Sequence, residues 1–242
     1  MRHFLTAALL AALPFSSAAQ TAAGVGQDAA IRAAIRTVNP AAEITWIHAT
    51  PIAGVREVNS EGNIVYMTTD GRFLIVGEII DLRTGSNHTD HARSAYRAQR
   101  ITNSPKADRI IFKAPNEVAN IYVFTDTSCS FSRKFHERIP EFNRLGITVE
   151  YLAWPRAGLN SGDFVKMRNI WCAEDRKQAL DDAVAGRPIT AINCNSPVPS
   201  QLALGQHIGV EGTPAVFSQS GRHIGGFMEP EQLAQRLGLR KR

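Results

Sequence analysis

Apolar and polar positions follow two different patterns along the chain, and the change falls near its middle. Before about residue 82, short runs rich in β-branched and aromatic residues are separated by turn residues, which is typical of antiparallel strands. After about residue 107, strand-like runs alternate with stretches of helical periodicity, which favours parallel strands joined by helices. The pattern predicts an α/β protein of two domains, residues 20–82 and 107–242, with a polar linker at 83–106.

The first half begins with a helix, because residues 27–38 place apolar side chains at helical spacing before Asn39-Pro40 ends the pattern. Residues 60–63 predict a turn, and Asp70-Gly71 predicts a two-residue hairpin loop. A helix-plus-sheet unit of this size buries little core, so we expect it to pair with a second copy. Four strands are predicted, at 43–47, 55–58, 64–68 and 73–76.

The second half predicts strands at 120–124, 148–152, 215–217 and 223–225, and helical segments at 130–143, 163–185, 200–208 and 229–237. A helix joins the first two strands, which are therefore expected to be parallel. Phe131, Phe135 and Ile139 share one face of that helix, and Pro140 is expected to kink or end it. Strand, helix, strand, helical insertion, hairpin and helix is the order of a thioredoxin fold.

The N-terminus predicts export. A basic start at residues 1–3, an apolar run at 4–13 and small residues at 17–19 form a secretory signal, which we place at residues 1–19. The apolar run is too short to anchor the chain in a bilayer, so we expect a soluble mature protein. The bacterial periplasm is the expected location.

Composition and residue spacing argue against two classes of function, nucleic-acid binding and metal binding. The 242 residues are 44% hydrophobic and carry a net charge of +5 that is spread along the chain, with a dense basic cluster only at 240–242. Nucleic-acid binding is disfavoured, since basic and aromatic residues do not interleave. His88 and His91 lie in the polar linker without a cysteine or carboxylate cluster to complete a metal site. We therefore predict no metal and no cofactor.

The chain has three cysteines, an odd number for an exported protein. An oxidising compartment pairs thiols, and an unpaired one suggests a reactive group. Cys172 and Cys194 lie in the same segment, and closing a loop of that size contributes roughly 3 kcal/mol in the chain-entropy model. This pairing leaves Cys129 as the free thiol.

Cys129 lies within TDTSCSFSRKFHE, residues 125–137, just after a predicted strand and at the start of a predicted helix. The helix dipole and the free amide groups of the first turn favour a thiolate there, and Arg133 and Lys134 add positive charge. The alternative is a buried, inert cysteine. Thr213-Pro214 precedes another strand, where a cis X-Pro bond would leave the preceding backbone free to pair with an extended substrate.

Five stretches together resemble the periplasmic disulfide isomerases of the DsbC/DsbG type. They are VFTDTSCSFSRKFHERI, GITVEYLAWPRAGLNS, IWCAEDRKQALDDAVAG, LGQHIGVEGTPAVF and the N-terminal hairpins. The resemblance spans the mature chain and is closest from about residue 109 to 226. It implies a small α+β, cystatin-like dimerisation domain, a linker helix and a thioredoxin-like domain with a helical insertion. It also implies a V-shaped homodimer whose two thiols face a cleft that holds misfolded, misoxidised exported proteins.

The resemblance also implies roles for individual residues. Cys129 matches the catalytic nucleophile, Thr213 and Pro214 match the substrate-binding loop, and Cys172 with Cys194 match the structural disulfide. Ser132 departs from the family pattern, because it occupies the position of the resolving cysteine. The Gly-Tyr pair usual between the two cysteines is replaced by Ser130-Phe131.

Ser132 limits the chemistry but does not abolish it. Isomerisation needs one thiolate, which attacks a wrong disulfide and is released when the client's own thiol attacks in turn. Reduction normally uses a second enzyme thiol, so a membrane thiol reductase or a small thiol would have to free stalled complexes. Two alternatives remain open at this point: a protein that handles mixed disulfides or sulfenic acids, and a redox-silent homodimeric chaperone.

Overall fold

The computed structural model describes residues 18–192 and 194–239. The described chain forms two compact units, each with its own core. The first unit ends at Val76 but leaves out Glu61–Ile64, and the second contains that hairpin tip and the chain from Gly77 onward. Residues 1–17 of the predicted signal peptide and the basic cluster at 240–242 lie outside the described residues.

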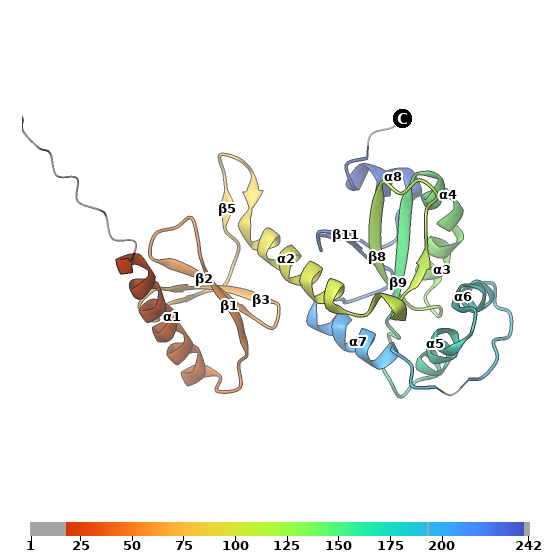
Figure 1. The fold of residues 1–242 in the computed structure, drawn as a ribbon, viewed down its shortest axis with the longest axis horizontal. Helices are drawn as coiled ribbons and strands as arrows, with labels where there is room; N and C mark the ends of the chain where they lie inside the picture. Colours follow the sequence, from red (N-terminus) through yellow and green to blue (C-terminus); the bar gives the residue numbers. More distant parts are fainter. Residues whose placement is uncertain (1–17, 193, 240–242) are drawn as a thin grey trace, which may run out of the picture. The chain divides into compact units, whose positions relative to one another are not determined.

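The first unit is a helix packed on a four-stranded antiparallel sheet (Figure 1). Its sheet order is β1-β2-β3-β4, which leaves β1 and β4 at the edges. Ile31 of the helix packs against Val58 and Met67 of the sheet, and all three are buried. The elements are α1 (Ala18–Val38), β1 (Ile44–Ala49), β2 (Val55–Ser60), β3 (Asn63–Thr68) and β4 (Leu74–Ile75).

The turn predicted at residues 60–63 is confirmed, whereas the one at Asp70-Gly71 differs from the prediction. The two-residue loop is Glu61-Gly62 between β2 and β3, and both residues have positive φ, 51° and 94°. That combination matches the right-handed twist of the strands, although glutamate adopts it at a cost. The predicted two-residue loop at Asp70-Gly71 is wrong: Thr68 N donates to Phe73 O, so the turn is longer. Asp70 accepts from the Thr68 hydroxyl and from Arg72 N, which stabilises the longer loop.

The stretch predicted as a polar linker contains regular structure. The short strands β5 (Ile80–Asp81) and β6 (Ser86–Asn87) form a hairpin, and α2 (His88–Asn103) follows. Asn87 caps α2 by accepting from Asp90 N at 3.0 Å. The helix is not solvated throughout, because Ile101 is fully buried and Arg97 Nε donates to Ile208 O within the second unit.

The second unit has a five-stranded sheet in the order β11-β10-β8-β9-β7. β8 and β9 are parallel, as predicted, while β10 pairs with β8 and β7 pairs with β9 in antiparallel fashion. The strands are β7 (Ile110–Phe112), β8 (Ala119–Thr125), β9 (Ile147–Ala153), β10 (Ala215–Ser218) and β11 (His223–Gly225). The edge strand β7, which is three residues long, was not predicted from the sequence.

The helices of the second unit that follow α2 pack on this sheet or on one another (Figure 1). They are α3 (Ser130–Glu137), α4 (Ile139–Arg144), α5 (Gly162–Cys172), α6 (Arg176–Val184), α7 (Val198–His207) and α8 (Pro230–Arg236), and a 3-10 turn, η1 (Lys106–Asp108), precedes β7. Val123 and Tyr151 of the central strands lie in one core with Phe135 and Phe142 of the helices. Among the described helices, none is both long and apolar enough to cross a bilayer.

The helix predicted at 130–143 is two helices. Arg138 leaves helical geometry between α3 and α4, and Pro140 stands in the first turn of α4, where its missing N–H costs nothing. Phe135 and Ile139 are buried as expected. Phe131 is not: its side chain is 55% exposed and its ring lies beside that of Phe227, with centroids 6.2 Å apart.

Candidate active site

A buried carboxylate holds the loop that leads from β8 to Cys129. Asp126 is fully buried, and its carboxylate accepts from Ser128 N at 2.8 Å and from Arg156 N at 2.9 Å. The Ser128 hydroxyl lies 2.7 Å from Asp126 and 3.0 Å from Asp163. Cys129 N donates to Asp126 O at 3.0 Å. These bonds fix the backbone just before Cys129, so the thiol is placed by the end of a central strand.

Cys129 is the N-cap residue of α3, with an extended backbone. The first-turn amides of a helix have no partners within the helix, and they point toward the cap. Phe131 and Ser132 supply such amides here. Cys129 is 5% exposed and is the free cysteine of the three. Arg133 donates to Thr127 O and Ser128 O, so its guanidinium also stabilises this loop.

The loop before β10 closes the other side of the thiol. Cys129 Sγ donates to Thr213 O at 3.1 Å, although the two residues are 84 positions apart in sequence. The Thr213–Pro214 peptide bond is cis. β10 pairs with β8, the strand that leads to Cys129, and this pairing brings the two loops together.

The surroundings of the sulfur favour the thiolate. Burial raises the pKa of the Cys129 thiol, but the Thr213 side chain, the Ser132 amide and hydroxyl, and the Phe131 amide lower it more. The net pKa therefore lies below that of an ordinary cysteine. The contact with the Thr213 carbonyl acts in the other direction, since a carbonyl oxygen accepts from a thiol and repels a thiolate.

The other two cysteines are joined to each other. Cys172 at the end of α5 forms a disulfide with Cys194, with Cα atoms 5.9 Å apart. The bond ties the end of α5 to the chain that precedes α7.

Comparisons with known proteins cover nearly the whole chain. Residues 16–90 match the disulfide bond isomerase protein N-terminal domain, and residues 105–240 match a thioredoxin-like domain. The thiol:disulfide interchange protein DsbC of Salmonella typhimurium is 36% identical over 232 residues, which cover 96% of this chain and 93% of the relative. Escherichia coli DsbC is 35% identical over 236 residues, with coverage of 98% and 95%.

The chain belongs to the DsbC family of thiol:disulfide interchange proteins. A crystal structure of a disulfide interchange protein from Neisseria gonorrhoeae aligns with a TM-score of 0.50 and 26% identity, covering 57% of this chain and 99% of that one. Its DsbC relatives support an enzyme of the thiol:disulfide oxidoreductase kind.

The DsbC-type fold brings four of the predicted site residues together. Cys129 contacts Thr213, which precedes Pro214, and Ser132 lies in the first turn of α3 with 2% of its surface exposed. The bonded pair of cysteines belongs to the helical insertion and its connection to α7.

Sequence reasoning missed the residues that hold the loop. Asp126 and Arg156 are 30 positions apart, and Asp163 is in the first turn of α5. The stretch Asp126-Thr127-Ser128 carries one local signal, because an aspartate two residues before a serine is typical of an Asx turn. The partners Arg156 and Asp163 carry none, since their positions depend on how β9 and α5 pack.

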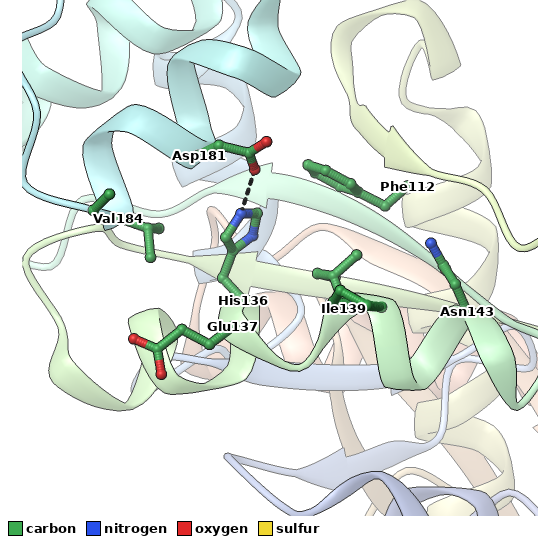
Figure 2. A pocket seen from close by; sticks show the side chains of 9 residues that line it. Phe112, His136, Glu137, Ile139, Asn143, Asp181 and Val184 are labelled. Atoms are coloured by element: carbon green, nitrogen blue, oxygen red, sulfur yellow. Dashed lines mark hydrogen bonds and ion pairs between the residues drawn. The ribbon is translucent and has the colours of Figure 1, made fainter.

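A separate pocket of about 620 Å³ lies between α3, α4, α6 and β7, and Figure 2 shows its lining. His136 Nε2 is 2.7 Å from Asp181, and Nδ1 is 3.2 Å from the hydroxyl of the buried Tyr151. Burial lowers the pKa of His136, partly offset by Asp181. Phe112 and Ile139 form apolar walls beside the imidazole. The pocket does not contain Cys129, and the hydrogen bonds of His136 join α3 to α6 and β9.

Proposed function

We propose that this protein isomerises wrong disulfides in exported proteins through the single thiol of Cys129. The observation that carries the proposal is the environment of that thiol: it is free, it caps α3, and its pKa is lowered. The relatives named thiol:disulfide interchange proteins support the same chemistry.

The cycle needs no second enzyme thiol. The Cys129 thiolate attacks a client disulfide, forms a mixed disulfide and expels a client thiolate. A second client thiolate then attacks the client sulfur of that bond and expels Cys129. Ser132 cannot resolve the intermediate, because a hydroxyl forms no disulfide. A small thiol or a membrane thiol reductase therefore releases complexes that stall.

Thr213 and Pro214 are the proposed client-binding loop. The Thr213 carbonyl already accepts a hydrogen bond at the position that a client chain beside Cys129 would use. Phe131, half exposed next to the thiol, offers an aromatic face to apolar client segments. Unfolded proteins expose such segments, so this surface suits misfolded clients without sequence preference.

The protein is proposed to act in the periplasm as a homodimer. Its predicted signal peptide supports export. The edge strand β4 and the residues around it, 73–76, expose four apolar side chains in a row. An exposed apolar edge strand is an unstable surface for a monomer and pairs readily with a second copy.

Refolding of a scrambled-disulfide protein tests the function. The parent should regenerate native disulfides over many turnovers when a trace of glutathione is present, and Cys129→Ala should lose this activity to background. Acid-quenched samples should contain client adducts on Cys129 that decay faster as glutathione rises. Ser132→Cys should add reductase activity, because a second thiol can expel a reduced client.

Two other results would point to the alternatives. If the parent and Cys129→Ala refold clients equally well and no adducts form, the protein is a redox-silent chaperone. Turnover of a glutathionylated peptide without turnover of scrambled protein would indicate a protein that handles mixed disulfides of small thiols.

A further inference from the structure

Two hydroxyls beside Cys129 are buried without a hydrogen-bond partner among residues 18–192 and 194–239. One is Ser132 Oγ and the other is Thr213 Oγ1. Ser132 is 2% exposed, so solvent does not satisfy its hydroxyl. An unsatisfied buried hydroxyl costs about 1–3 kcal/mol, which calls for a compensating role.

Ser132 lies in the same first helical turn that Cys129 caps. Cys129 is the N-cap of α3 and Ser132 is the third residue of the helix. In a capping box the side chain at the third position reaches back to the N-cap residue, which is the direction that would bring the Ser132 hydroxyl toward Cys129. The Ser132 hydroxyl is also among the groups that lower the pKa of Cys129.

In the structure the Cys129 thiol donates to Thr213 O, and Ser132 Oγ has no partner among the described residues. A thiolate has no proton to donate and instead accepts hydrogen bonds. Ionisation of Cys129 would therefore satisfy the sulfur and the serine hydroxyl at once.

We propose that Ser132 is a positioning residue that donates its hydroxyl hydrogen bond to the departing Cys129 sulfur and so directs resolution toward the client side of the mixed disulfide. This inference rests on the proposed isomerase function. In the step, a client thiolate R′S⁻ attacks the client sulfur of Cys129–S–S–R. The S–S bond of R–S–S–R′ forms, the S–S bond between Cys129 and R breaks, and its electron pair stays on Cys129 as the thiolate. One disulfide is exchanged for another, so no oxidant or reductant is consumed.

The direction follows from leaving-group chemistry. Of the two sulfurs in a mixed disulfide, attack is faster on the one whose partner leaves as the more stable thiolate. A hydrogen bond from Ser132 stabilises Cys129 as the leaving group. Attack on the client sulfur transfers the disulfide within the client, which is isomerisation, whereas attack on the Cys129 sulfur only releases a reduced client.

The first test is a thiolate titration by ultraviolet absorbance. Ser132→Ala should lower the thiolate fraction about tenfold at a pH below the parent midpoint, as expected for one lost hydrogen bond to a charged group. Threonine and valine have the same shape, but only threonine carries a hydroxyl. The pKa of Cys129 should therefore be lower in Ser132→Thr than in Ser132→Val. Ser130 is exposed and directly follows Cys129 in the sequence. The thiol of the Ser130→Ala variant should therefore titrate like that of the parent.

The second test measures how the mixed disulfide between Cys129 and a client is broken. A peptide with two cysteines is joined to Cys129 through one of them, and glutathione is added. Acid-quenched products are either cyclic peptide, from attack on the peptide sulfur, or linear peptide, from attack by glutathione. The cyclic rate should fall about threefold in Ser132→Ala and Ser132→Val, given the Brønsted dependence on leaving-group acidity. Ser132→Thr and Ser130→Ala should keep the parent rate.

The two hypotheses fail differently. If Ser132→Ala and Ser132→Val titrate and cyclise the peptide as the parent does, the role of Ser132 is overturned even though Cys129 still isomerises scrambled protein. If Cys129→Ala refolds scrambled protein as well as the parent, the isomerase proposal itself fails. Should Ser132→Ala not fold, the Thr and Val pair decides the question.

Discussion

At the residue scale, the Cys129 sulfur lies between groups with opposite preferences. The Thr213 carbonyl favours the thiol, while the amides and hydroxyls of α3 and Thr213 favour the thiolate. The amides and hydroxyls outweigh the burial of the sulfur, because the net pKa is lowered. A cysteine used as nucleophile and leaving group needs this balance, since both roles depend on the thiolate.

The lowered pKa predicts a pH-dependent contribution to stability. The folded protein releases the Cys129 proton at a lower pH than the unfolded chain, in which a cysteine titrates near ~8.5. The contribution is therefore fully present above the unfolded pKa and is lost as the pH falls through the folded pKa. Denaturant unfolding should show that the parent gains stability relative to Cys129→Ala as pH rises through that window.

Protein alkylated at Cys129 is the control for that measurement, because it keeps the bulk of the side chain but cannot ionise. Its stability should change with pH as Cys129→Ala does. A constant difference between the parent and Cys129→Ala at all pH values would contradict a lowered pKa.

At the scale of elements, α2 is held against the turn between β10 and β11. A Cβ on Gly221 would clash with Ser94 O and Ala98 N, both in the backbone of α2. Gly221 therefore permits a close approach that any side chain would prevent. The contact fixes the helix that precedes the thioredoxin-like sheet to the end of that sheet.

Gly221→Ala should accordingly destabilise the protein more than Gly186→Ala. Both glycines have similar positive φ, 77° and 74°, but a Cβ on Gly186 meets nothing within 4 Å. The backbone cost is thus the same in the two variants, and the difference measures the packing against α2. We expect about 1–3 kcal/mol in the free energy of unfolding, as for overpacked sites. Equal losses in the two variants would show that α2 moves aside freely.

At the scale of the whole molecule, the small first unit leaves apolar surface uncovered. Phe73, Leu74, Ile75 and Val76 are 57%, 57%, 46% and 78% exposed, and β4 is an edge of the sheet. Its buried core contains few large side chains. Pairing with a second copy would bury this row and add a sheet edge to the interface.

Replacing Leu74 and Val76 by lysine should convert the proposed dimer to monomer in sedimentation experiments. Lysine on an edge strand opposes pairing between sheets by charge repulsion and desolvation. Val165→Lys is the matched control, since Val165 is 43% exposed on α5 of the second unit and is not part of this row. A double variant that still sediments as a dimer would place the interface elsewhere.

The sequence by itself determined the elements of both units. Periodicity over a few residues depends only on which side chains face a core, so most strands and helices, and the parallel pairing of β8 and β9, were predicted correctly. The position of Cys129 at the start of a helix and the absence of a cysteine at Ser132 are also local facts of the chain. The two-residue turn predicted at Asp70-Gly71 was wrong, because the Asp70 carboxylate accepts hydrogen bonds from Thr68 and Arg72 that stabilise a longer loop.

Only the tertiary structure decided what surrounds the thiol. The partners of the β8–α3 loop come from distant segments: Thr213 reaches Cys129 because β10 pairs with β8, and Arg156 reaches Asp126 from the chain that follows β9. The exposure of Phe131 likewise depends on what covers the first turn of α3, not on its spacing from Phe135. Local patterns encode which side of an element is apolar. The polar atoms that meet at the end of an element depend on the order of the strands in the sheet. That order cannot be read from the residues that neighbour the element in sequence.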